Sequence, residues 1–218
     1  LNILNKFENS KYVKVKCLSV HIGSQITDYK PYLKMLNVLD LIIKKSKYIF
    51  EYVDLGGGMG IQYDRKTKVF NYNKYNKIIK KFLKKNNVKI IFEPGRSIIA
   101  NTAVLFSQII YIKNTNKKKF IILDAAMNDL MRPALYGSYH NIIPLLKTNK
   151  KNKKIHDFVG PVCETTDKFL SVKSFQSLKE KDFVAISDVG AYGMSLSSNY
   201  NLRPKPLEIM INKKSMRV

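Results

Sequence analysis

The chain has 218 residues, carries a formal net charge of +23, and is 45% hydrophobic and 11% aromatic. No apolar run approaches the ~18 residues that a membrane-spanning helix needs, and two cysteines are too few for a disulfide framework, which together favour a cytoplasmic protein. The charge comes mostly from lysines in Lys/Asn runs such as "IIKKFLKKNNVK", typical of solvated surfaces, so we expect neither specific nucleic-acid binding nor membrane contact.

The first half alternates short apolar runs with longer amphipathic ones. "VKVKCLSVHIGSQ" predicts a strand that enters a loop, and "YKPYLKMLNVLDLIIKKS" predicts a helix, because its apolar residues recur at helical spacing after an early proline. "FEYVDLGGGMGI" predicts a strand ending in a glycine-rich turn, "YNKYNKIIKKFLKKN" a second helix with a basic outer face, and "VKIIFEPGR" a third strand. This order favours a parallel α/β fold.

After about residue 97 the pattern changes to strand-like pieces separated by turns: "AVLFSQIIYIK", "KKFIILDAA", "KIHDFVGPVCE" and "KDFVAISDVGAYG". We therefore expect an α/β plus β protein, with a partial β/α barrel over 1–96 and a mostly β domain over 97–218. Three β/α units cannot close a barrel of eight, and the sequence starts in mid-pattern without Met, so we expect further residues before Leu1.

The glycine run Gly56–Gly58 follows an apolar strand and leaves backbone N–H groups open to an anion such as a phosphate. A tight turn explains the same glycines equally well. The run is neither a Walker loop nor a Rossmann fingerprint. His21 ends the preceding predicted strand, where its ring is either a structural histidine or a flat surface for a planar cofactor.

The third strand ends in Glu93-Pro94-Gly95-Arg96, an acid and a base held by two residues that shape the backbone. The simplest interpretation is an ion pair that closes a turn. A carboxylate at a strand end is also suited to the protonated nitrogen of a pyridine ring, and an arginine to a carboxylate or phosphate.

Five further side chains in the second half are candidates. Arg132 and Tyr136 are four residues apart and, on one helical turn, would present a guanidinium and a phenol together for carboxylate recognition. Cys163 precedes Glu164 in the polar loop "VGPVCETTD", which favours a proton-donating thiol over an inert buried one. Tyr192 lies between glycines in "DVGAYG", where a phenol can reach a phosphate.

Seven motifs, taken in order, resemble the fold-type III, alanine-racemase-like family of pyridoxal-phosphate decarboxylases. They are "HIGSQ", "DLGGGMGI", "EPGR", "NDLMRPALYGSYH", "GPVCETTD", "SDVGAYG" and "NYNLRPKP", and they span about Leu18 to Glu208 with order and spacing kept. The resemblance implies the C-terminal part of a (β/α)8 barrel followed by a mostly β, sandwich-like domain. It also implies pyridoxal 5'-phosphate as cofactor and no metal.

The resemblance implies a role for each candidate residue. His21 would stack on the pyridine ring, the backbone of Gly57 and Gly58 would bind the phosphate, and Glu93 would pair with the ring nitrogen. Cys163 would donate a proton, and the implied catalytic set is Cys163 and His21. The implied cofactor-binding set is His21, Gly57, Gly58, Glu93, Pro94, Gly95, Arg96 and Tyr192, and the implied substrate-binding set is Arg96, Arg132, Tyr136, Glu164 and Tyr192.

Within the family, the resemblance implies decarboxylation of meso-diaminopimelate to L-lysine and carbon dioxide, in a homodimer with shared active sites. Related ornithine and arginine decarboxylases tend to carry Asp after the cysteine, so Glu164 favours diaminopimelate, with the related enzymes as the alternative. Cys163 and Glu164 would reach the partner's site.

One family feature has no counterpart in the sequence. The lysine that binds the cofactor covalently belongs to an early barrel strand upstream of "HIGSQ", and none of the lysines present matches that position. We therefore expect the isolated chain to be inactive without an N-terminal part. A non-catalytic remnant of the same fold and a nucleic-acid-binding protein are the other hypotheses.

Overall fold

The computed structural model describes residues 2–7, 9–46, 48–64, 66–211 and 216–217. The chain divides into two compact units, Leu1–Ile98 (unit 1) and Ile99–Val218 (unit 2). No helix among the described residues is both long and apolar enough to cross a membrane.

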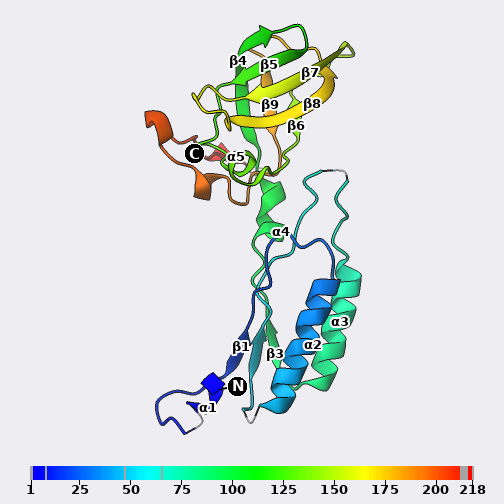
Figure 1. The fold of residues 1–218 in the computed structure, drawn as a ribbon, viewed down its shortest axis with the longest axis vertical. Helices are drawn as coiled ribbons and strands as arrows, with labels where there is room; N and C mark the ends of the chain where they lie inside the picture. Colours follow the sequence, from blue (N-terminus) through cyan, green and yellow to red (C-terminus); the bar gives the residue numbers. More distant parts are fainter. Residues whose placement is uncertain (1, 8, 47, 65, 212–215, 218) are drawn as a thin grey trace. The chain divides into compact units, whose positions relative to one another are not determined.

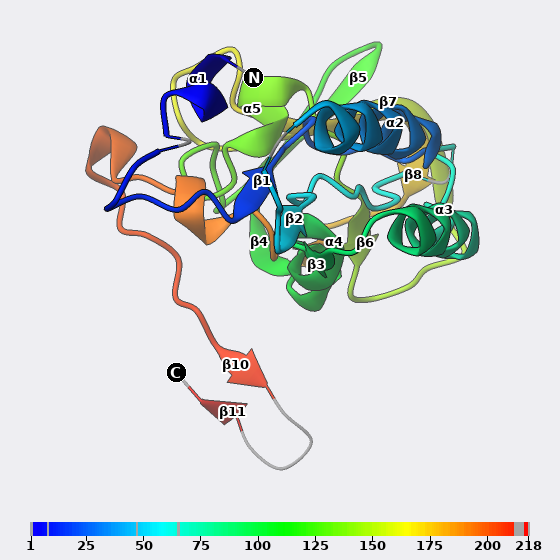
Figure 2. The same cartoon turned by 90° about the horizontal axis from the view of Figure 1, so that it is seen from below.

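Unit 1 is built on a parallel three-stranded sheet in the order β1 (Cys17–Ser19), β2 (Tyr52–Asp54), β3 (Lys89–Ile91). Helix α2 (Lys30–Lys45) connects β1 to β2, and α3 (Tyr72–Lys85) connects β2 to β3. Figures 1 and 2 show both helices on the same side of the sheet. The short helices α1 (Asn2–Asn5) and α4 (Arg96–Ile99) precede β1 and follow β3. The β-α-β-α-β order is therefore confirmed for this part of the chain.

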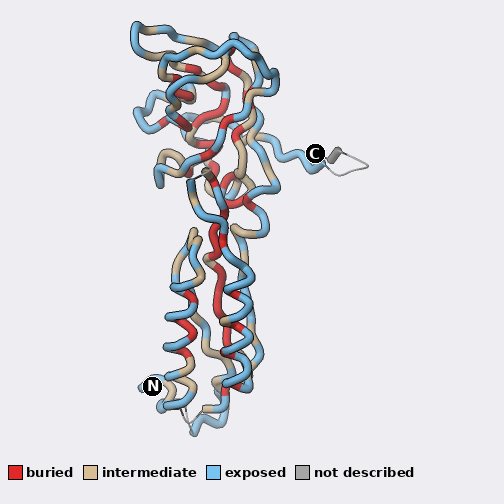
Figure 3. The backbone as a smooth tube through the Cα atoms, turned by 90° about the vertical axis from the view of Figure 1, so that its right-hand side faces the viewer, coloured by how far each residue is buried: buried red, intermediate tan, exposed pale blue. Residues whose placement is uncertain are grey.

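The two long helices begin where the sequence signals a start. Pro31 lies in the first turn of α2, and the Asn71 side chain accepts a hydrogen bond from the Lys74 N–H at 2.9 Å as the N-cap of α3. Each helix buries one face against the sheet, visible as separate red segments in Figure 3. The buried helix residues are Tyr32, Met35, Leu36 and Leu39 on α2 and Tyr75, Ile79 and Phe82 on α3.

Unit 2 is mostly β. Its six strands form one continuous mixed sheet in the order β6-β9-β4-β5-β7-β8, with β5 and β7 parallel and the other neighbours antiparallel. The strands are β4 (Leu105–Asn114), β5 (Lys118–Leu123), β6 (Ile142–Pro144), β7 (Lys151–Val159), β8 (Lys168–Gln176) and β9 (Phe183–Ile186). The strands of this sheet share an apolar core, which includes Ile109, Leu123, Phe158 and Ile186.

Short elements join the strands of unit 2. Helix α5 (Arg132–Tyr136) lies between β5 and β6, and β10 (Met210–Ile211) pairs antiparallel with β11 (Met216–Arg217). The 3₁₀ helices are η1 (Ala100–Thr102), η2 (Met194–Leu196) and η3 (Tyr200–Leu202). The expected mostly β second half is confirmed, and the expected sandwich-like domain takes the form of one mixed sheet.

Candidate functional site

The tips of the three unit 1 strands meet at the carboxyl edge of the parallel sheet. His21 follows β1, Gly56–Gly58 follow β2, and Glu93 follows β3. The Gly57 N–H donates to Nδ1 of His21 at 3.3 Å, and the Glu93 N–H donates to the Gly56 carbonyl at 2.9 Å. The chain thus places an exposed imidazole, a buried glycine turn and an exposed carboxylate side by side, at the edge where parallel α/β folds bind ligands.

Close backbone approach explains why this turn consists of glycines. A Cβ atom on Gly57 would lie 2.2 Å from the Glu93 carbonyl oxygen, and one on Gly58, whose φ is +88°, would lie 2.2 Å from the Gly23 carbonyl oxygen. The Tyr32 hydroxyl, on α2, donates to the Gly57 carbonyl at 2.9 Å. Burial raises the pKa of this phenol, which therefore remains a donor. The glycine turn is therefore held by the residues after β3 on one side and by Tyr32 of α2 on the other.

Asp54 is a residue of this edge that the sequence interpretation missed. Its buried carboxylate accepts hydrogen bonds from the Gly56 N–H at 2.9 Å and from the Ser19 hydroxyl at 3.1 Å, and so links the tips of β1 and β2. An acid at the end of an apolar strand, two residues before a glycine run, was the available signal. Asp54 shapes the turn and does not face outward as a ligand-binding group.

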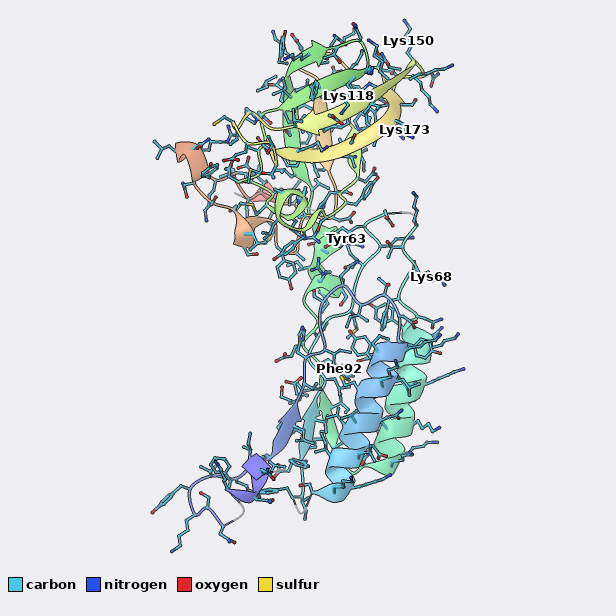
Figure 4. The ribbon with its side chains drawn as sticks, viewed as in Figure 1. Tyr63, Lys68, Phe92, Lys118, Lys150 and Lys173 are labelled. Carbon is cyan, nitrogen blue, oxygen red and sulfur yellow. The ribbon has the colours of Figure 1, made fainter. Side chains whose placement is uncertain are left out.

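Arg96, at the end of the Glu93–Arg96 turn, contacts two neighbouring loops. The Arg96 guanidinium donates from Nη1 to the Tyr63 hydroxyl at 2.7 Å and from Nη2 to the Ser24 hydroxyl at 3.1 Å. Tyr63, labelled in Figure 4, also lies with its ring centroid 5.7 Å from the guanidinium carbon. Arg96 is thereby oriented by the loops that follow β1 and β2.

In unit 2, Arg132 begins α5 and is 4% exposed, whereas Tyr136 ends α5 and is 66% exposed. The two side chains, expected to share one face, therefore lie in different environments. The Arg132 guanidinium contacts Nε2 of His140 at 2.8 Å and donates to the Ser138 hydroxyl at 3.2 Å. Gly137 caps the end of helix α5, and its φ of 61° reverses the chain toward Ser138 and His140.

Cys163 and Glu164 lie on the exposed loop between β7 and β8. The Tyr200 hydroxyl, on η3, donates to Oε1 of Glu164 at 2.6 Å, and this hydrogen bond to a carboxylate raises the pKa of Tyr200. Asn201, also on η3, places its amide nitrogen 3.9 Å from Sγ of Cys163. The sequence interpretation missed Tyr200 and Asn201, although both lie in the "NYNLRPKP" motif.

The same loop is anchored by a buried acid. Asp167 accepts hydrogen bonds from the Met127 N–H at 2.7 Å and the Val162 N–H at 2.8 Å, and burial raises its pKa. A Cβ atom on Gly160 would lie 2.3 Å from the Asp167 carboxylate. Asp167 therefore connects the Cys163 loop to the segment that leads into α5.

Tyr192 occupies a tight loop after β9. It has a φ of 60°, which is uncommon for a residue with a large side chain, and it is 44% exposed. Gly190 and Gly193 flank it at points where a Cβ atom would lie 2.0 Å from the Ile99 carbonyl and 2.3 Å from the Val189 carbonyl. A cavity of about 270 Å³ borders this loop at Val189, Gly190 and Gly193.

Within unit 1 the structure therefore brings together His21, Gly56–Gly58 and Glu93, with Arg96 on the turn that follows. Within unit 2 it places Cys163 and Glu164 against η3, and Arg132 against His140. Among the described residues, no three His, Cys, Asp or Glu side chains are grouped so that they would hold a metal ion. The functional groups that these residues provide are an imidazole, carboxylates, guanidinium groups and a thiol.

Comparisons with known proteins agree on one family. The model of the pyridoxal-dependent decarboxylase, C-terminal sheet domain, matches residues 21–190. A diaminopimelate decarboxylase of Aquifex aeolicus is 37% identical over 98% of this chain, and one of Zymomonas mobilis is 40% identical over 97%. The crystal structure of diaminopimelate decarboxylase from Helicobacter pylori complexed with L-lysine matches 99% of this chain and 54% of its own, with a TM-score of 0.91 and 35% identity. The chain spans about half the length of the curated relatives it matches, 51% of each of the two named here.

Proposed function

The chain belongs to the pyridoxal-dependent decarboxylase family, and from this premise we propose that it is part of an enzyme that decarboxylates meso-diaminopimelate to L-lysine and carbon dioxide. The observation that carries the proposal is the meeting of His21, the Gly56–Gly58 turn and Glu93 at one sheet edge, in a chain with relatives of that name at 37–40% identity. Unit 1 would be part of a (β/α)8 barrel, and the enzyme would work in the cytoplasm.

The unit 1 edge fits pyridoxal 5'-phosphate. The backbone of Gly57 and Gly58 would bind the phosphate, as glycine turns do elsewhere, and the close contacts of both residues with the Glu93 and Gly23 carbonyls keep the turn in one conformation. The His21 ring would cover one face of the pyridine, Glu93 would accept a hydrogen bond from its ring nitrogen, and the Pro94–Arg96 turn would line the same space. Bound in this way, the cofactor supplies an electron-withdrawing ring next to the carbon that loses carbon dioxide.

Glu93 is the residue whose charge matters most for that chemistry. Its backbone is fixed by the 2.9 Å hydrogen bond to Gly56, while its side chain is exposed. A carboxylate next to the ring nitrogen favours the protonated ring, because an opposite charge within a few ångströms stabilises the cation.

Residues of unit 2 would handle the substrate. The Arg132 guanidinium, with Arg96, would bind carboxylates by charge-assisted hydrogen bonds, and Glu164 would accept the distal ammonium group. Tyr136 would lie beside these arginines, and Tyr192 would contact both the phosphate and the substrate. The Cys163 thiol would return a proton to the carbon after carbon dioxide leaves.

We propose a homodimer in which Cys163 and Glu164 serve the neighbouring chain's site. Both residues are exposed on the β7–β8 loop, as a group donated to another chain must be. The loop is nevertheless well fixed, by Asp167 on one side and Tyr200 on the other. A group that acts across an interface needs this kind of support, because its own chain must set its position.

Ligand binding by the complete gene product tests the proposal. Pyridoxal phosphate should bind with a change in visible absorbance, and pyridoxal without the phosphate should bind much more weakly. The bound-cofactor spectrum should then respond to meso-diaminopimelate at lower concentrations than to ornithine or arginine, and Glu164→Asp should narrow this preference. A spectrum that responds to ornithine or arginine first would assign the chain to the related decarboxylases, and no cofactor binding would refute the proposal.

A further inference from the structure

His140 is completely buried between α5 and the loop that follows β9. Its Nδ1 lies 2.8 Å from the Ser187 carbonyl oxygen, which can only accept a hydrogen bond, so Nδ1 carries the hydrogen. Its Nε2 lies 2.8 Å from Nη1 of Arg132, which can only donate, so Nε2 is the acceptor. The two contacts assign the ring to its neutral Nδ1–H tautomer.

The chain of hydrogen bonds runs from one candidate substrate-binding element to another. Arg132 opens α5, and Ser187 opens the loop that carries Tyr192. The guanidinium is held in a second direction by the Ser138 hydroxyl, at 3.2 Å from Nη2. Two of its nitrogen atoms are thus contacted by residues that follow α5 in the sequence, and the imidazole connects the guanidinium to the Tyr192 loop.

We propose that His140 is a positioning residue. It holds the Arg132 guanidinium in place relative to the Tyr192 loop, so that the guanidinium can bind the substrate carboxylate. This inference rests on the proposed function, because it takes Arg132 as a carboxylate-binding group. An arginine that binds a carboxylate through two parallel N–H groups needs a defined plane for its guanidinium. An acceptor at hydrogen-bond distance from Nη1 defines that plane, and burial of both partners at 0% and 4% exposure prevents water from replacing it.

A buried histidine that merely fills space is the alternative, and the chain contains one for comparison. His156, in β7, is 1% exposed, and its Nδ1 lies 2.9 Å from the Lys154 carbonyl oxygen. Its ring packs 6.0 Å from that of Phe175, and burial lowers its pKa. His156 therefore matches His140 in residue type, burial and carbonyl contact, but the structure gives it no arginine partner.

The experiment compares His140→Leu, His140→Gln and His156→Gln in the complete gene product loaded with pyridoxal phosphate. A glutamine side chain has one donor and one acceptor end, like the neutral imidazole, whereas leucine has neither. We expect His140→Leu to raise the KM for meso-diaminopimelate about tenfold or more, the change that a lost charge-assisted hydrogen bond produces. His140→Gln should recover most of this loss, and His156→Gln should lower thermal stability without changing KM.

The outcomes separate the two proposals. If the wild-type protein turns over meso-diaminopimelate and His140→Leu keeps its KM, or if His156→Gln raises KM equally, the positioning role is wrong and the proposed function stands. If the wild-type protein has no such activity, the proposed function is wrong, and nitrogen NMR still decides the local geometry. A neutral Nδ1–H His140, with Arg132 side-chain resonances that shift in His140→Leu and not in His156→Gln, supports the inference, and an Nε2–H tautomer overturns it.

Discussion

At Gly57 the backbone passes so close to the tip of the next strand that a methyl group would lie 2.2 Å from the Glu93 carbonyl oxygen. This contact couples the glycine turn to the residue proposed to pair with the cofactor ring. The EPGR motif, which contains Glu93, has a glycine of the opposite kind: an added Cβ on Gly95 meets nothing within 4 Å. Gly95 can therefore serve as the control for a substitution at Gly57.

The Gly57→Ala substitution tests the close approach without reference to activity. The added methyl group must displace either the turn or the tip of β3, so we expect a loss of about 1–3 kcal/mol in the free energy of unfolding. Gly95→Ala should leave that quantity within about 1 kcal/mol of the wild-type value, because the space is open. Chemical denaturation of the two variants measures the difference, and equal stabilities would show that the turn is looser than described.

The Cys163→Ala substitution tests the proposed proton donor. Loss of a positioned acid acts in the chemical step, so kcat should fall on the order of 100-fold or more while the affinity for pyridoxal phosphate stays the same. Steady-state kinetics and an absorbance titration of the cofactor provide the two values. Undiminished kcat would remove Cys163 from the mechanism.

The Tyr200→Phe substitution tests the support of Glu164. It removes the hydroxyl that donates to Oε1 of Glu164 at 2.6 Å and keeps the ring. Because both side chains are exposed, the free energy of unfolding should change little. The KM for meso-diaminopimelate should rise severalfold, with kcat affected less. A change in stability without a change in KM would make Tyr200 a purely structural residue.

At the scale of elements, each unit has a core of its own. In unit 2, Phe158 of β7 is fully buried, and its ring meets that of Phe175 at 5.1 Å in an edge-on arrangement. Phe106 of β4 also has an aromatic partner, since it stacks on Phe183 at 5.1 Å, but it is 53% exposed. Both phenylalanines have a ring partner, so the difference between them is burial.

This difference predicts the energetic contribution of the unit 2 core. Phe158→Ala leaves a cavity where no water can compensate and should destabilise unit 2 by about 3–5 kcal/mol. Phe106→Ala should cost about 1 kcal/mol, from lost stacking and partial re-exposure. Thermal unfolding of the pair checks the contrast. If Phe106→Ala were the more damaging change, the core would lie on the other face of the sheet.

The elements were predictable where the signal is local. Helix α2 follows from Pro31 and its apolar spacing, and β1 to β3 follow from apolar runs that end in glycine or Pro-Gly. Leu33 belongs to the same apolar spacing but is 37% exposed, because the helix turns Tyr32 and Leu36 toward the sheet. The sheet against which a helix packs decides which of its apolar residues are buried, and the helix sequence alone does not contain that information.

The candidate site was predictable where motifs lie at strand ends. The sequence placed His21, Gly57 and Glu93 at three such ends, and the structure brings them into contact. The supporting residues were not predictable. Tyr200 and His140 act on partners 36 and 8 residues away, through contacts that only the folded unit 2 creates.

At the scale of the whole molecule, 39 Lys and Arg residues outnumber 16 Asp and Glu residues. Figure 4 labels Lys118, Lys150 and Lys173 on unit 2, and of these Lys118 forms an ion pair with the buried Asp157 at 3.0 Å. Exposed lysines without such a partner contribute little to stability, and their like charges repel one another. The basic character therefore requires no polyanionic partner to explain it.

The proposed sharing of sites between two chains makes a quantitative prediction. Glu93→Gln and Cys163→Ala chains, each strongly impaired alone, should regain activity when they are mixed and allowed to exchange partners. Half of the resulting dimers contain one site with both groups intact, so activity should reach about a quarter of the wild-type level. No recovery in a mixture shown to exchange would place Glu93 and Cys163 of one chain in the same site.

The proposed decarboxylation is tested by the products that the complete gene product, loaded with pyridoxal phosphate, forms from meso-diaminopimelate. We predict one L-lysine for each carbon dioxide released, with ornithine and arginine turned over far more slowly. A protein that binds the cofactor yet forms no lysine, while a known diaminopimelate decarboxylase is active in the same assay, would contradict it.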